Sequence, residues 1–462
     1  MFYSRTLAVS LFILFLAVPV QATYLDDVGY TALVAELGTG VPTGAGISMS
    51  QVEAASSENY SPDTAASAFW GKTFTLMSGA SGVSSHATTV GTYLYGNSGM
   101  AKGVTAIKNW EANDWVSSGF LKTGTNSSPA LETQRVQNNS WVGSFGNDDT
   151  DQDAVRRFDF TINRDNYVAV VGLNNGSNTT VPNLLAANYN AITVGVSSGI
   201  HSRGTTLIDT KGRVKPDIVA PAAYTSYATP IVGAAAAILL QKADSSSIYT
   251  NARNSESIKA ILMAGATKEE FATWDRTQTR PLDDIYGAGE LNVYNSYHIL
   301  AAGEQNASTS SDAHTTGWDF DACSSSQNKY YFIDVGAGTS LTDVSIILTW
   351  NRVITDGIQG GNWGSPQASL ADLDLYLYSA EGYSVRINMD RSISDYDNVE
   401  HIYQPNLSAG RYAIVVTSSS ATSTDFSLAW RSTVEIIPEP ATLLLIVGVG
   451  GVLLLKGRRR LV

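Results

Sequence analysis

The chain of 462 residues is long enough for two or three domains, and its 44% hydrophobic and 15% charged residues are not the composition of a disordered protein. A formal net charge of −13 argues against nucleic acid as a partner and indicates an acidic surface. The single cysteine, Cys323, excludes an internal disulfide bond.

The first segment, residues 1–22, predicts a secretory signal peptide. Arg5 precedes an apolar stretch from Leu7 to Val18, and the small residues Val20 and Ala22 suit cleavage after Ala22. We therefore expect the protein to be exported.

Residues 44–54, GAGISMSQVEA, predict a tight turn and a strand that ends near Glu53. Farther along, His86 lies in GVSSHATTVGTYLYG (82–96), between small residues and at the start of a predicted helix. Of the five histidines, His86 is the one whose ring has room to meet a substrate.

The segment 146–154, GNDDTDQDA, contains four aspartates: Asp148, Asp149, Asp151 and Asp153. Carboxylates at this spacing can bind calcium, which prefers hard oxygen ligands. An exposed acidic turn is the alternative interpretation and the one that we favour. Structural calcium is thus the one cofactor that the sequence suggests, and no cofactor is required.

Three short apolar runs predict buried strands: NYVAVVGL (166–173), NAITVGV (190–196) and KPDIVAP (215–221). Strands without a polar face are typical of parallel sheets with helices on both sides. The fold predicted for residues 23–302 is therefore α/β, with a parallel β-sheet flanked by helices.

The stretch APAAYTSYATPIVGAAAAILL (220–240) predicts a buried helix that begins near Pro230, because proline suits the first turn. Ser226 would then lie just before the helix, where free N–H groups and the helix dipole stabilise a developing oxyanion. Capping of the helix by Ser226 or Thr229 is the alternative role.

The polar segment 303–317, GEQNASTSSDAHTTG, predicts a linker. Beyond it, DLDLYLY (372–378) alternates with a period of two, as a strand with one buried face does. No helical period is present between residues 325 and 432. Residues 318–434 are therefore predicted to form an all-β sandwich of jelly-roll type.

The last segment, residues 435–462, contains Pro438-Glu439-Pro440, an uncharged stretch at 441–455 and a basic tail that begins at Lys456. The apolar stretch is short for a membrane span of about 20 residues, and the basic tail would stay in the cytoplasm. A plain tail anchor is one interpretation, but the order of the parts resembles the PEP-CTERM sorting signal of Gram-negative bacteria. This resemblance implies transient anchoring in the inner membrane, removal of the tail by an exosortase-type enzyme, and a final location at the cell surface or outside the cell.

Six segments between residues 84 and 293 resemble, in order, motifs of the subtilisin-like serine proteases (the peptidase S8 or subtilase family). They are SSHATTVGT around His86, VVGLNNG (170–176), NAITVGV, GRVKPDIVAP, YTSYATP around Ser226 and YGAGELNV (286–293). The resemblance implies a serine endopeptidase with a polypeptide substrate. Ser226 would attack the peptide carbonyl, His86 would carry the proton, and Asn174 would contribute to the oxyanion hole.

The third member of the catalytic triad departs from the family pattern. Glu53 stands where the family has an aspartate, so the resemblance implies a Glu53–His86–Ser226 triad with a longer carboxylate. Asp26, Asp27 and Asp63 are rival carboxylates, and the absence of any functional carboxylate is a third option.

Other departures lie beside the two remaining triad members. Ala87 replaces a glycine after His86, Thr89 replaces a second histidine, and Tyr224 replaces the glycine before Thr225-Ser226. A loop next to the nucleophile is also missing, which predicts a more open site. These changes leave two alternatives to a general endopeptidase: a catalytically inactive binding or surface-structural protein, and a protease that cleaves only itself near 303–317.

Overall fold

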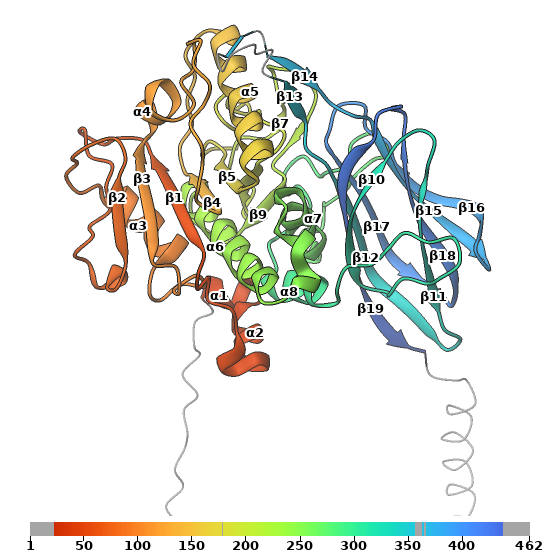
Figure 1. Ribbon diagram of the computed structural model, residues 1–462. Coiled ribbons are helices and arrows are strands. Elements are labelled where there is room, and N and C mark those ends of the chain that lie inside the picture. The colour runs from red at the N-terminus through yellow and green to blue at the C-terminus, as the bar shows by residue number, and fades with distance from the viewer. Residues whose placement is uncertain (1–22, 178, 356–362, 365, 438–462) are drawn as a thin grey trace, which may run out of the picture.

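The computed structural model describes residues 23–437, except 178, 356–362 and 365. The predicted signal peptide and the sorting signal from Pro438 onward lie outside the described residues. Figure 1 shows a mixed helical and sheet portion formed by the first two thirds of the chain, beside a β-rich portion formed by the last third.

The first portion is built on a seven-stranded sheet in the order β2-β3-β1-β4-β5-β6-β9. All neighbouring strands in it are parallel. The strands are β1 (Ser48–Glu53), β2 (Thr73–Leu76), β3 (Ala106–Glu111), β4 (Val136–Asn139), β5 (Val168–Gly172), β6 (Ile192–Val196) and β9 (Ile218–Ala220). The predicted α/β fold with a parallel sheet is confirmed.

Helices cover both faces of this sheet because its strands bury apolar side chains on both sides. In β5, Val170 faces the core that contains α6, whereas Val171 faces the core that contains α5. The α-helices are α1 (Tyr24–Asp27), α2 (Tyr30–Leu37), α3 (Ser85–Tyr95), α4 (Ala112–Asp114), α5 (Asp148–Asp165), α6 (Thr225–Asp244), α7 (Ser255–Gly265) and α8 (Val293–Ala301). A two-stranded pair, β7 (Gly204–Thr205) and β8 (Val214–Lys215), lies apart from the main sheet.

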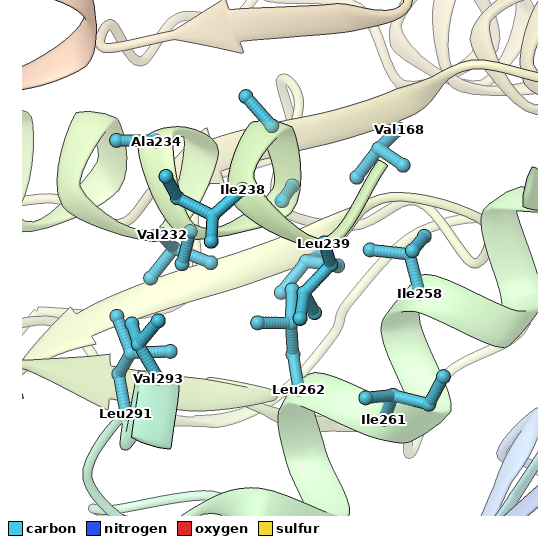
Figure 2. Packing of buried hydrophobic residues seen from close by; sticks show 14 of the residues in the cluster. Val168, Val232, Ala234, Ile238, Leu239, Ile258, Ile261, Leu262, Leu291 and Val293 are labelled. Carbon is cyan, nitrogen blue, oxygen red and sulfur yellow. The ribbon is translucent and has the colours of Figure 1, made fainter. Parts of the chain in front are cut away.

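Helix α6 is the central element of the larger core. Its side chains share a core with those of β5 and α7, and Figure 2 shows Leu239 of α6 beside Leu262 of α7. A Cβ atom on Gly233 would lie 2.9 Å from Leu94 of α3 and 3.2 Å from Val170 of β5. Glycine at this position therefore allows α6 to pack closely against both α3 and the sheet.

Helix α6 begins earlier than the sequence predicted. It starts at Thr225, so Ser226 lies in its first turn, and Pro230 lies inside the helix. Proline has no N–H to give to the carbonyl four residues earlier, which here is that of Ser226. The Ser140 hydroxyl donates to that carbonyl instead, at 3.0 Å, so the helix continues through the proline.

The second portion is a sandwich of two antiparallel sheets, in the orders β10-β19-β12-β17 and β11-β18-β15-β16. Its strands are β10 (Gly317–Cys323), β11 (Lys329–Val335), β12 (Thr339–Thr349), β15 (Leu373–Glu381), β16 (Ser384–Ser392), β17 (Val399–Leu407), β18 (Gly410–Ser418) and β19 (Thr424–Ile436), with a hairpin of β13 (Val353–Thr355) and β14 (Gln367–Ser369) at one side. The predicted all-β sandwich is confirmed.

The two portions pack against each other through α7, β12 and β19 and through buried polar contacts. Arg352 of the second portion inserts into the first, where its Nε donates to Asp159 at 3.0 Å and its guanidinium lies over the ring of Tyr189. The segment 303–317 is bound to the sandwich, since the N–H groups of Gln305 and Ala313 donate to Trp318 and Phe332. Within the described part of the chain, no helix is both long and apolar enough to span a bilayer.

Candidate active site

The predicted triad residues come from elements that meet at the carboxyl edge of the parallel sheet. Glu53 is the last residue of β1, and Asn174 follows the end of β5. Helices α3 and α6 pack side by side and begin at Ser85 and Thr225, which places His86 and Ser226 in their first turns. Ligands of parallel α/β sheets bind at this edge, so the position suits a functional site.

Glu53 and His86 are joined directly. The Oε2 atom of Glu53 lies 2.7 Å from Nδ1 of His86. Glu53 is completely buried, whereas the His86 side chain is 38% exposed. The buried carboxylate therefore holds the ring through Nδ1 and leaves the other ring nitrogen, Nε2, available to accept a proton.

A polar group that the sequence analysis did not predict holds the second oxygen of Glu53. The Gln51 amide donates to Glu53 Oε1 at 2.8 Å and to the Ala87 carbonyl at 2.9 Å. The Tyr95 hydroxyl in turn donates to Oε1 of Gln51. Gln51 thus links the strand that carries Glu53 to the helix that carries His86, and both oxygens of the carboxylate have partners.

Burial and hydrogen bonding shift the titration of this pair. The hydrogen bond to Glu53 raises the pKa of the His86 imidazole above its ordinary value, against the opposing effect of burial. Burial raises the pKa of the Glu53 carboxyl, and the hydrogen bonds from His86 and Gln51 oppose that rise. Burial also raises the pKa of Tyr95, so its hydroxyl stays protonated and remains a donor to Gln51 at neutral pH.

Ser226 lies half-buried in the first turn of α6, beside the helix that carries His86. The ring of the next residue, Tyr227, is centred 6.0 Å from that of His86. No hydrogen bond joins Ser226 Oγ to His86 among the residues described. Hydrogen bonds between nucleophile and base are often long in a free enzyme and tighten when substrate binds.

The two asparagines after β5 have different partners. The carbonyl oxygen of the Asn175 side chain accepts from the N–H of Thr225 at 3.0 Å and from its hydroxyl at 3.1 Å, which anchors the start of α6. Asn174 is held through its backbone, which exchanges hydrogen bonds with Ser202. Neither contact involves the side chain of Asn174, which the sequence predicts to act in the oxyanion hole.

The rival carboxylates lie in other environments. Asp26 belongs to α1, together with Asp27, and binds the N–H of Thr23 at 2.6 Å. Asp63 accepts from the N–H of Ala65 at 3.2 Å. Among these acidic groups and Glu53, Glu53 is the one hydrogen-bonded to His86.

The acidic segment 146–154 forms the start of α5. Asp148 and Asp149 lie in its first turn. Asp151 accepts from the N–H of Phe145 at 2.7 Å, and Asp153 binds Arg157 at 2.7 Å. In the described ranges, no group of three or more His, Cys, Asp or Glu side chains is arranged to hold a metal ion.

The sequence contains a local signal for Gln51. This residue lies two residues before Glu53 in the same strand, and such residues share one face. Tyr95, Ser140 and Asn175 had no comparable signal, because each acts on a residue that is distant in the chain.

Comparison with known proteins identifies one family. The model of the subtilase family, Peptidase_S8, matches residues 56–289, just over half of the chain. His86, Asn174 and Ser226 lie inside this range, and Glu53 lies before it. Proteases from Pseudoalteromonas arctica PAMC 21717, a solved structure, match with 14% identity and a TM-score of 0.37, over 57% of this chain and 93% of that chain. A search of curated proteins finds no match.

Proposed function

Because the chain belongs to the subtilase family, we propose that it is a serine endopeptidase with a Glu53–His86–Ser226 triad. The observation that carries this proposal is the 2.7 Å contact between buried Glu53 and Nδ1 of His86. A carboxylate on Nδ1 fixes the tautomer in which Nε2 accepts a proton, and it stabilises the imidazolium that follows.

The reaction proceeds by acyl transfer. Ser226 Oγ attacks the peptide carbonyl while its proton passes to Nε2 of His86. The oxyanion forms at the positive end of α6, where the Ser226 N–H and the Asn174 side chain donate to it. His86 then gives its proton to the leaving amine, and a water molecule, activated by the same ring, hydrolyses the acyl-enzyme.

The proposal extends to the location of the protein. The segments 1–22 and 435–462 support export from a Gram-negative bacterium, brief anchoring in the inner membrane and release of the tail by an exosortase-type enzyme. Mass spectrometry of the protein recovered from its native cells tests this. The expected product begins at Thr23 and lacks the basic tail, and an intact carboxyl terminus would contradict the processing step.

Labelling of the purified protein by a fluorescent fluorophosphonate tests the chemistry. Such probes react with serines that a neighbouring base activates, so we expect labelling that disappears in both Ser226→Ala and His86→Ala. A folded protein that takes up no label would instead favour the alternative of an inactive binding or surface-structural protein. In that case the replacements at Glu53 and Tyr224 would mark the loss of catalysis.

A further inference from the structure

Three tyrosines surround the first turn of α6 on the side of His86. Tyr227 follows the nucleophile directly, and its ring stacks on that of Tyr93 of α3 with centroids 5.8 Å apart. Tyr224, the residue before the helix, packs edge-on against Tyr227 at 5.6 Å. We call Tyr93, Tyr224 and Tyr227 the tyrosine wall.

The wall is accessible to a substrate. Tyr224 is 52% exposed, and Tyr93 and Tyr227 are each partly exposed. Tyr24 of α1 supports the far end, since its ring packs edge-on against Tyr93 at 5.3 Å. The wall therefore offers aromatic surface that is held in place by ring-to-ring contacts.

The strand order shows which half of a substrate would meet this wall. Glu53 and Asn174 lie at the ends of β1 and β5, which are separated in the sheet by β4. His86 and the predicted oxyanion donor therefore approach Ser226 from different sides. The protonated base delivers its proton to the leaving amine, so the leaving segment must lie on the side of His86.

We propose that the tyrosine wall binds the residue directly after the scissile bond and selects substrates with an aromatic side chain there. This inference rests on the proposed acyl-transfer function. The centroid of the Tyr227 ring lies 6.0 Å from that of His86. Because His86 delivers the proton to the leaving amine, Tyr227 lies on the side of the site where the leaving segment would bind. Aromatic rings favour offset-stacked and edge-on partners, which a further aromatic side chain can supply against Tyr224 and Tyr227.

Partitioning of the acyl-enzyme tests this preference without depending on the rate of acylation. The protein is acylated by a peptidyl ester in the presence of phenylalanine amide or leucine amide, and the ratio of aminolysis to hydrolysis is measured. Both products arise from the same acyl-enzyme, so the ratio reports binding on the leaving side alone. We expect phenylalanine amide to capture the acyl group about three- to tenfold better than leucine amide, the advantage of an aromatic pair.

Two variants and one control make the test specific. Tyr227→Leu and Tyr224→Ala should each lower the advantage of phenylalanine amide, whereas Tyr378→Ala, in β15 of the distant sandwich, should leave it unchanged. Release of the ester alcohol shows that the protein forms the acyl-enzyme. If that acyl-enzyme is then captured equally by the two amides, the proposed role of the tyrosine wall is overturned and the proposed function stands. Failure to release the alcohol would overturn the proposed function and this inference with it.

Discussion

In the proposed triad, Glu53 takes the place of an aspartate with a side chain that is one methylene longer. The extra length adds a rotatable bond, so a free glutamate would hold His86 less firmly. Burial and the amide of Gln51 remove that freedom, because each carboxylate oxygen has its own partner at 2.7 or 2.8 Å. The hydrogen bond from the Tyr95 hydroxyl to Gln51 fixes the orientation of this amide.

Replacement of Glu53 by glutamine should lower kcat by about 10⁴, the cost of losing the carboxylate of a serine-protease triad. Glu53→Asp keeps the charge and should retain part of the activity. The base must be neutral, so activity rises as the pH passes upward through the pKa of His86. Because the bond to Glu53 raises that pKa, Glu53→Gln should also move the acidic limb of kcat/KM to lower pH. A glutamine variant with wild-type kcat would remove Glu53 from the triad.

Helix α6 owes its position to contacts from two loops that follow strands. Ser140, after β4, binds the carbonyl that Pro230 leaves free, and Asn175, after β5, binds the first N–H of the helix. The turn that carries Ser226, the proposed nucleophile, is therefore held by segments far from it in the chain. Its helix starts where these contacts place it, five residues before the position that Pro230 suggested.

The adjacent asparagines provide a matched pair of substitutions for this element. Asn174→Ala should lower kcat by about 10²- to 10³-fold with little change in KM, because an oxyanion donor acts only in the transition state. Asn175→Ala removes a capping acceptor and should lower the free energy of unfolding by about 1 kcal/mol. Kinetics and urea denaturation of both variants separate the two roles. A change in KM alone for Asn174→Ala would assign that side chain to substrate binding.

At the scale of the whole molecule, buried polar groups join the sandwich to the first portion, which carries the candidate active site. Lys268, which follows α7, donates to Ser345 of β12 at 3.3 Å and lies over the rings of Trp274 and Tyr403. Burial, with repulsion from Arg431, lowers the pKa of Lys268 to about 7, while Asp343 and Glu270 oppose this fall. The interface therefore contains an amine that titrates near neutral pH.

This amine links stability to pH. Between about pH 7 and the ordinary lysine range, the unfolded chain holds a proton that the folded chain has released, so stability should rise with pH. Each such proton contributes at most about 1.4 kcal/mol per pH unit. Lys268→Met should reduce this slope in urea denaturation between pH 7 and 10, and Lys211→Met, at an exposed position, should keep it. Identical slopes for the wild type and Lys268→Met would exclude Lys268 as the source.

The sequence by itself determined the type and order of the elements. The apolar runs at 166–173, 190–196 and 215–221 specified strands buried on both faces, and the alternation in 372–378 specified a strand with one buried face. Local motifs also indicated His86, Ser226 and Asn174 as site candidates. These signals are local, because the periods of strands and helices depend on residues that are close together in the chain.

Only the tertiary structure decided how the candidate site is held together. The pairing of Glu53 with His86 over the rival aspartates, the contacts of Gln51 with Tyr95, and the stacking of Tyr93 on Tyr227 join segments that are far apart in the chain. Such contacts depend on how strands and helices pack in space. The pattern of residues within one strand or helix does not specify that packing. The start of α6 differed from the prediction for the same reason. The hydroxyl of Ser140, in a distant loop, donates to the Ser226 carbonyl the hydrogen bond that Pro230 cannot make.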